Sequence, residues 1–368
     1  MATPAFTNSN SPLKAQICEL IQKNGPIPFR QYMELALFDP DHGYYTSESK
    51  TVGKEGDFIT SVSVGHCFGL ILARRLIQFW EDSNRPACFS IIEPGAHNGS
   101  LCADILQEIK TQSPVFYDAV HYHLVETSNH IQSEQSALLS ADYHGKFTAH
   151  TSLDDVRADH GVIISNELID AFPVELIKFK DEEWWQMYVS ECNGELKFTE
   201  QKTQDNEIAD FCQSLGNSFP DDYLTEYSPS VRSFAHEASA ALQSGLIITI
   251  DYGYQAEEYY HPSRMCGSLQ TYYQHQKSDN PLDNPGELDI TCHINFSHLT
   301  EELSAQGFTR PSLLKQASYL TLHARGWLGE IEARFDELEQ APALLRQFQT
   351  LTHPAMLGTK FMVLEMIK

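Results

Sequence analysis

The sequence lacks several patterns that would assign a protein class at once. Its 368 residues contain no apolar run of bilayer-spanning length, the best run being the strand-sized 246–250, so membrane insertion is not expected. Residues 1–13 carry neither a basic residue nor an apolar core, so no signal or transit peptide is predicted. Eight cysteines occur without a Cys-x-x-Cys pair, which predicts reduced core thiols, a cytoplasmic location and no metal site.

Positive charge is also scarce. The chain has 25 Lys and Arg against 50 Asp and Glu, a formal net charge of −25. A chain this acidic would repel nucleic acid, which is therefore not expected as a partner, whereas a basic protein or peptide substrate is compatible. Hydrophobic residues make up 42% and charged residues 20%, the composition of a globular protein with ample material for a core.

The chain is organised around residues 89–101. The short apolar run 89–92 predicts a buried parallel strand. A turn with Gly95 and Gly99 follows, and apolar residues then recur at helical spacing over 101–109. Strand, glycine turn and helix form the opening unit of a nucleotide-binding α/β sheet, because glycine lets the backbone approach a ligand and the helix N-terminus offers free N–H groups.

Two residues of this stretch bear on the ligand. Glu93 at the strand end would repel a pyrophosphate but suits a cofactor with an amine and a sulfonium, such as S-adenosylmethionine. His97 stands where the middle glycine of such loops is expected. The motif alone is therefore weak, and an ordinary strand-to-helix turn is the alternative.

Predicted strands and helices alternate, which indicates an α/β protein with a parallel, Rossmann-like sheet. We expect an N-terminal helical cap over 1–82 and a main domain over 83–368 with insertions at about 174–243 and 254–295. The second insertion is irregular, whereas the first contains a hairpin turn at 192–194 and a mostly helical stretch from 205. Predicted strands are 89–92, 121–126, 146–149, 161–167, 246–251 and 360–367, the last antiparallel; predicted helices are 13–23, 29–38, 68–80, 101–109, 131–139 and 296–303.

Polar residues end four of the predicted strands. They are Glu93, Glu126, Asn166 with Glu167, and Asp251. In an open α/β sheet, ligands bind beyond the carboxyl ends of the strands, so these residues predict a binding crevice. A carboxylate such as Glu126 can accept hydrogen bonds from both hydroxyls of a ribose.

Asp170 follows Glu167 by three positions. If a helical turn follows the strand, the two carboxylates share a face and can grip a guanidinium through charge-assisted bonds. The alternative is that Asp170 only caps a turn before Pro173.

Stretches along almost the whole chain resemble the MidA family of class I methyltransferases, found in bacteria and mitochondria. In chain order these are 25–29 with Tyr32 and Met33, 37–40, 43–45, 56–61, 68–69, 93–99, 125–128, 166–173, 250–253, 267–269, His275, 285–293 and 358–361. The resemblance implies a Rossmann-like domain that uses S-adenosylmethionine, covered by added helical segments.

The resemblance also implies site residues. Glu167 and Asp170 would be catalytic and face the methyl acceptor. In the cofactor site, Glu93 and the glycine loop would hold the methionine part and Glu126 the ribose. The full cofactor set is Asp57, Thr60, Ser61, Glu93, Gly95, Gly99, Glu126 and Asn166. The mitochondrial member is an assembly factor of respiratory complex I that methylates an arginine of a subunit, so the resemblance implies a protein substrate, such as a respiratory-complex subunit.

The chain departs from the family pattern at His97, at Val62 and Ser63 in place of Pro-Glu, at Gln270 in place of Arg, and at Asn295 in place of Asp. These departures leave open a second hypothesis, a catalytically degenerate binding or assembly factor. A nicotinamide-dependent oxidoreductase, which the glycine turn alone would permit, is disfavoured by Glu93.

Overall fold

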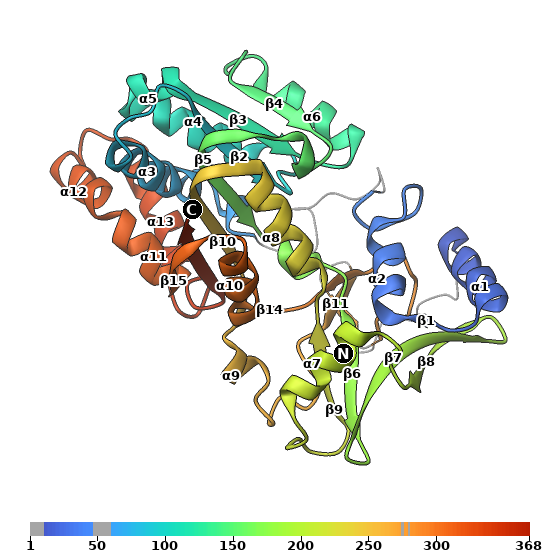
Figure 1. Cartoon of the computed structure of the whole chain (residues 1–368). Coiled ribbons are helices and arrows are strands. Elements are labelled where there is room, and N and C mark those ends of the chain that lie inside the picture. The colour runs from blue at the N-terminus through green and yellow to red at the C-terminus, as the bar shows by residue number, and fades with distance from the viewer. Residues whose placement is uncertain (1–10, 47–59, 274–275, 279) are drawn as a thin grey trace. The chain divides into compact units, whose positions relative to one another are not determined.

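The computed structural model describes residues 11–46, 60–273, 276–278 and 280–368, drawn in Figure 1. They divide into two compact units. The first consists of Met1–Phe58, Asp170–Val231 and Gln255–His293, and the second of Ile59–Ile169, Arg232–Tyr254 and Ile294–Lys368. Within the described ranges, no helix has the length and apolarity needed to cross a bilayer.

The second unit is built on an eight-stranded sheet with strand order β15-β16-β10-β5-β2-β3-β4 and with β14 beside β10. Strands β2, β3, β4, β5 and β10 are parallel, and β16 is antiparallel to both β10 and β15. The α/β fold class and the antiparallel last strand are thus confirmed. The bounds are β2 (Phe89–Pro94), β3 (Val120–Val125), β4 (Phe147–His150), β5 (Ala158–Asn166), β10 (Leu242–Tyr254), β14 (Ile294–Asn295), β15 (Thr309–Lys315) and β16 (Phe361–Ile367).

Helices complete the second unit, and their apolar faces meet the sheet in one large core. The expected helices are present as α3, α4, α6 and α10, whereas the helices between β15 and β16 were not predicted. Asn295 caps α10 by accepting from the N–H groups of Ser297 and His298, as its position before the helix predicts. The bounds are α3 (Cys67–Asp82), α4 (Ser100–Gln112), α5 (Pro114–Ala119), α6 (Asn129–Leu139), α10 (Phe296–Ala305), α11 (Gln316–His323), α12 (Arg325–Ala333) and α13 (Ala341–Thr352); α8 (Ser230–Ala241) runs into this unit from the first.

Helix α3 explains why the compact units do not follow the boundary that we expected at residue 82. Its buried face includes Phe68, Ile71, Leu72 and Leu76, and it packs against α4, α11 and α13. Burying such an apolar stripe stabilises the helix mainly through tertiary packing. Residues 60–82 therefore belong to the sheet-containing unit.

The first unit contains an antiparallel sheet, β1-β7-β6-β9 with β8 beside β7, and a three-stranded sheet, β12-β11-β13. The hairpin β7–β8 turns at residues 193–194 as expected, whereas β9 lies in the stretch from 205 for which we expected mostly helix. The strands are β1 (Ile27–Pro28), β6 (Glu175–Lys180), β7 (Glu183–Cys192), β8 (Glu195–Gln201), β9 (Tyr223–Tyr227), β11 (Gln270–Tyr273), β12 (Gln276–Ser278) and β13 (Asp289–Thr291); the helices are α1 (Pro12–Asn24), α2 (Phe29–Phe38), α7 (Asn206–Leu215) and α9 (Ala256–Tyr259).

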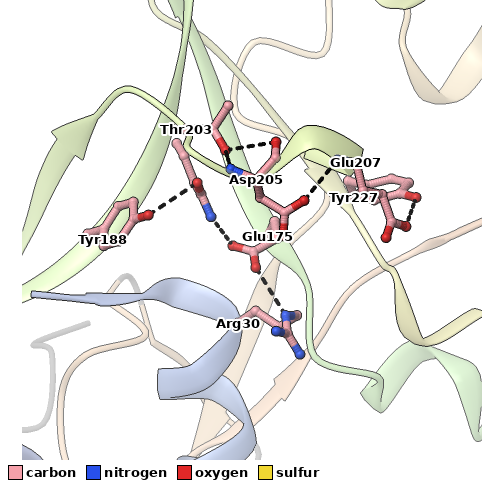
Figure 2. A network of polar contacts seen from close by, with 8 residues as sticks. Arg30, Glu175, Tyr188, Thr203, Asp205, Glu207 and Tyr227 are labelled. Carbon is pink, nitrogen blue, oxygen red and sulfur yellow. Dashed lines mark hydrogen bonds and ion pairs between the residues drawn. The ribbon is translucent and has the colours of Figure 1, made fainter. Parts of the chain in front are cut away.

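A polar network joins α2 to the antiparallel sheet of the first unit (Figure 2). Arg30 on α2 donates from Nε to Oε1 of the buried Glu175 at 3.0 Å. The other oxygen of Glu175 accepts from Nε2 of Gln186 at 2.9 Å, and Tyr188 donates to Oε1 of that amide. Burial raises the pKa of Glu175, against the bonds from Gln186 and Arg30 that lower it. The buried carboxylate is thus paired on both oxygens, as its desolvation demands.

Candidate functional site

The polar strand ends of the second unit lie along one edge of its sheet. Strands β3, β2, β5 and β10 are consecutive neighbours and run parallel, so their carboxyl ends meet at the same edge. Glu93 lies in β2, Glu126 follows β3, Asn166 ends β5, and Asp251 lies near the end of β10. The sheet therefore brings together the residues that the sequence placed there, at the edge where ligands bind in such folds.

The glycine turn after β2 needs its two glycines. Gly95 has a φ of +71° and Gly99 a φ of +82°, both in the left-handed region that favours glycine. A Cβ on Gly95 would lie 2.8 Å from Cδ1 of Leu168, and one on Gly99 would lie 3.2 Å from Cδ1 of Leu139. The positive φ and the close neighbouring side chains therefore both favour glycine at these two positions.

His97 also has a positive φ, of +42°, although it carries a side chain. Its carbonyl accepts from Nε2 of Gln135 at 2.6 Å, and its N–H donates to the carboxylate of Glu126. Gln135 is fully buried in α6. Hydrogen bonds on both sides of the residue therefore hold the turn in the shape that a glycine would adopt freely.

Glu93 is deeply buried and accepts from the hydroxyl of Tyr122 on β3 at 2.6 Å. Burial raises its pKa to about 8, and the bond from Tyr122 opposes that shift. Desolvation disfavours the carboxylate form, so a nearby cation would stabilise its ionised form. An amine or a sulfonium would supply such a charge.

Glu126 is directed by backbone groups just beyond β3. Its Oε1 accepts from the N–H of Ser128 at 3.1 Å, and the N–H groups of Thr127 and His97 also donate to the carboxylate. These bonds lower its pKa, but partial burial outweighs them and the net shift is upward. The side chain is thus held in one orientation, which suits the acceptance of bonds from ribose hydroxyls.

Glu167, directly after β5, has a φ of +49°, which is uncommon for a residue other than glycine and is characteristic of functional sites. Its Oε1 accepts from the N–H of Ser61 and from Nδ2 of Asn166, both at 3.2 Å. These two donors fix the carboxylate. The sequence predicted Ser61 and Asn166 as cofactor residues, not as hydrogen-bond partners of Glu167.

Asn166 has a second feature of interest. Its Nδ2 donates to Glu167, which leaves Oδ1 directed elsewhere, and Oδ1 is buried without a hydrogen-bond partner within the described part of the chain. A buried acceptor without a donor costs roughly 1–3 kcal/mol. A bound group with N–H donors would satisfy it.

Thr60 and Ser63 close a short turn before α3. The N–H of each donates to the hydroxyl oxygen of the other, at 3.0 and 3.1 Å, in the reciprocal pattern of a capping box. The glutamate that the resemblance expects at position 63 would occupy the acidic position of such a box. Ser63 therefore keeps the local bond that the expected residue would make.

The remaining predicted residues lie elsewhere. Asp57 is outside the described residues. Asp170 belongs to the first unit, in the short turn η3 (Ile169–Ala171), and its carbonyl accepts from the N–H of Cys292 at 2.8 Å. Asp170 also lies close enough to Tyr45 to act on its pKa, which is raised by burial first, then by the charge of Asp289 and then by that of Asp170. The shared face that we expected for Glu167 and Asp170 stays a prediction, because the two residues belong to different units.

Sequence reasoning missed three residues that hold this site: Tyr122, Gln135 and Gln316. Tyr122 and Gln135 bond Glu93 and His97 as described, and Gln316 on α11 accepts from the hydroxyl of Ser61 at 3.0 Å. No local pattern marks them, because each acts on a residue distant in the sequence.

Comparisons with known proteins agree with this geometry. Residues 71–313 match the family model described as "Putative S-adenosyl-L-methionine-dependent methyltransferase". Over 403 residues the chain is 25% identical to the protein arginine methyltransferase NDUFAF7 homolog, mitochondrial, of Drosophila melanogaster, covering 99% of this chain and 87% of that protein. It is 26% identical over 325 residues to protein arginine methyltransferase NDUFAF7, mitochondrial, of Mus musculus, covering 80% and 70%.

A solved structure is similar over nearly its whole length. It is a protein from Burkholderia thailandensis bound to S-adenosyl-homocysteine, with 27% identity and a TM-score of 0.84, covering 97% of this chain and 92% of that chain. The acceptor groups at the sheet edge fit such a ligand: Glu93 and Glu126 supply carboxylates, and Asn166 supplies a buried acceptor without a partner within the described residues. Carboxylate and amide oxygens accept from an ammonium group and from ribose hydroxyls.

Proposed function

The chain belongs to this family of S-adenosylmethionine-dependent methyltransferases, and we propose on that premise that its methyl acceptor is an arginine side chain of a protein. Two observations support the acceptor. The curated relatives are named protein arginine methyltransferases. The acidic chain, with its net charge of −25, suits a basic substrate.

Within the second unit, we assign the cofactor contacts to the sheet edge and the glycine turn. Asn166 accepts from the ammonium group of the methionine part through its buried Oδ1, with Glu93 as the nearby negative charge. Glu126 accepts from the ribose hydroxyls. Gly95 and Gly99 keep the turn open to the ligand, and Thr60 belongs to the covering segment. When bound, S-adenosylmethionine supplies a methyl group on a sulfonium that is already activated as a leaving group.

The proposed chemistry at the acceptor rests on one observation, the fixed carboxylate of Glu167. Its strained backbone and its two fixed donors hold a carboxylate beside the cofactor residues. Methyl transfer depends mainly on alignment, but an arginine is protonated in water and must lose a proton. Glu167 orients the guanidinium and accepts that proton. We retain Asp170 of the first unit as the second acceptor carboxylate.

The test is transfer of a radiolabelled methyl group from S-adenosylmethionine to proteins of a cell extract, followed by acid hydrolysis and amino-acid analysis. We expect label in methylarginine, lost in Glu167→Gln and in Asp170→Asn. Calorimetry with S-adenosyl-homocysteine should show these two variants binding like the unaltered protein, and Glu126→Ala binding weakly. Label in another amino acid, or full activity of Glu167→Gln, would contradict the acceptor assignment.

The degenerate binding factor is the less favoured candidate. Its sequence support was His97 and Ser63, and both residues have local structural functions: His97 is bonded through its N–H and its carbonyl, and Ser63 closes the turn with Thr60. Absence of cofactor binding in the calorimetry would revive it.

We propose a subunit of a respiratory complex as the protein partner, on the family resemblance alone, and the cytoplasm as the location. All eight cysteines are free, and three of them, Cys88, Cys192 and Cys266, are exposed, which supports a reducing compartment. The curated relatives are named mitochondrial. Cell fractionation tests the location, and affinity capture with the respiratory subunits as bait tests the partner.

A further inference from the structure

We propose that Gln316 is a positioning residue for methyl transfer, which fixes the carboxylate of Glu167 by holding Ser61. The inference rests on the proposed function of Glu167 and adds two residues to it. Neither Ser61 nor Gln316 needs to touch substrate or cofactor for this purpose.

The amide of Gln316 has a defined orientation. Gln316 is fully buried as the first residue of α11, and its Nε2 donates to the carbonyl of Leu351 on α13 at 3.1 Å. A carbonyl can only accept, so the nitrogen must face Leu351 and Oε1 must face the hydroxyl of Ser61, 3.0 Å away. Ser61 therefore donates its hydroxyl proton to Gln316.

Ser61 carries that restraint to Glu167. It is itself fully buried, and its predicted contact with the cofactor stays a prediction. Its hydroxyl is bound to Gln316 while its N–H points at Oε1 of Glu167. Fixing the hydroxyl fixes the direction of the N–H.

Glu167 needs such support because its own backbone does not provide it. With a φ of +49°, the residue adopts a conformation that the surrounding structure must enforce. If Ser61 shifts, Oε1 of Glu167 loses the bond from the Ser61 N–H, one of the contacts that orient the carboxylate. A misplacement of about 1 Å in a reacting group costs on the order of 100-fold in rate.

A second glutamine provides a matched control. Gln347 on α13 accepts through Oε1 from the N–H of Cys67 at 3.0 Å, so it holds the same stretch of chain near the start of α3. That bond does not lead to Glu167. Gln316→Leu and Gln347→Leu thus remove the same chemical group from two helices that contact each other, and only the first breaks the connection to the carboxylate.

The experiment compares both variants with the unaltered protein in the methyl-transfer assay and in hydrogen exchange read by mass spectrometry. We expect Gln316→Leu to lower kcat by about 10- to 100-fold, with little change in the affinity for S-adenosyl-homocysteine, and to speed exchange in a peptide containing Ser61. Gln347→Leu should keep its kcat. Gln316→Glu keeps an acceptor for Ser61 and should recover part of the activity.

The outcomes separate this inference from the proposed function. If Glu167→Gln loses transfer and Gln316→Leu retains it with unchanged exchange at Ser61, the positioning function of Gln316 is wrong and the acceptor assignment stands. If Glu167→Gln retains transfer, the acceptor assignment itself fails. Equal losses of kcat and equal exchange in both leucine variants would show general loosening of the helices and overturn the inference.

Discussion

At the scale of single residues, burial sets the chemistry of the cofactor edge. Glu93 is desolvated enough that its pKa rises to about 8. Burial also raises the pKa of Glu126, against three backbone N–H groups whose bonds favour its charged form. Burial raises the pKa of both carboxylates, and the more buried Glu93 gains most from a cationic ligand.

This difference predicts how stability depends on pH. The folded protein binds the Glu93 proton more tightly than the unfolded chain, so stability is lost as pH rises from about 4.5 to about 8. Glu93→Gln removes that contribution. The free energy of unfolding of the variant, relative to the unaltered protein, should therefore rise by about 1.4 kcal/mol per pH unit in this window. Urea titrations at pH 5, 7 and 9 measure it, and a constant difference across the three would contradict the prediction.

At the scale of elements, short turns carry the departures from the family pattern. The turn before α3 is closed by two bonds between Thr60 and Ser63, and the turn after β2 is held at His97 by Gln135 and Glu126. In both turns a substituted residue keeps the backbone geometry. His97 does so through its own N–H and carbonyl, and Ser63 through a hydroxyl that accepts from the N–H of Thr60.

The first turn gives a stability prediction. Ser63→Ala removes the acceptor for the Thr60 N–H and should cost about 1 kcal/mol, the usual net value of one lost hydrogen bond. Ser63→Glu restores the acidic residue of a capping box and should be close to the unaltered protein. Denaturant unfolding of the three proteins tests this. If alanine and glutamate behave alike, the reciprocal bonds do not contribute to stability.

At the scale of the whole molecule, charge is the dominant property. Twenty-five basic residues oppose 50 acidic ones, so the summed field attracts a basic substrate over distances comparable with the screening length, about 10 Å at 0.1 M salt. This long-range attraction affects the rate at which enzyme and substrate associate more than the rate of methyl transfer.

A salt dependence follows for an arginine-rich peptide acceptor. Raising the salt concentration from about 0.05 to 0.5 M shortens the screening length and should increase KM for the peptide severalfold while kcat stays nearly constant. Steady-state kinetics at matched pH measure both constants, with a peptide of zero net charge as the control. An unchanged KM would show that the negative charge does not recruit the substrate.

The sequence by itself determined the α/β sheet and its polar edge. Apolar runs, glycines and the carboxylates at strand ends are local patterns, so β2, β3, β5 and β10 and the residues Glu93, Glu126 and Glu167 could be placed without coordinates. Strand β9 and helices α11–α13 were not predicted, and of these α11 has little amphipathic pattern of its own.

Only the tertiary structure decided which residues hold the site. Gln316 and Ser61 are 255 positions apart, and no periodicity in the chain encodes a hydrogen bond between two side chains at such a separation. The membership of residues 60–82 in the sheet-containing unit was likewise decided by the burial of α3 in a core assembled from distant helices. Local pattern fixes which elements form, whereas contacts between distant segments fix what each functional side chain can do.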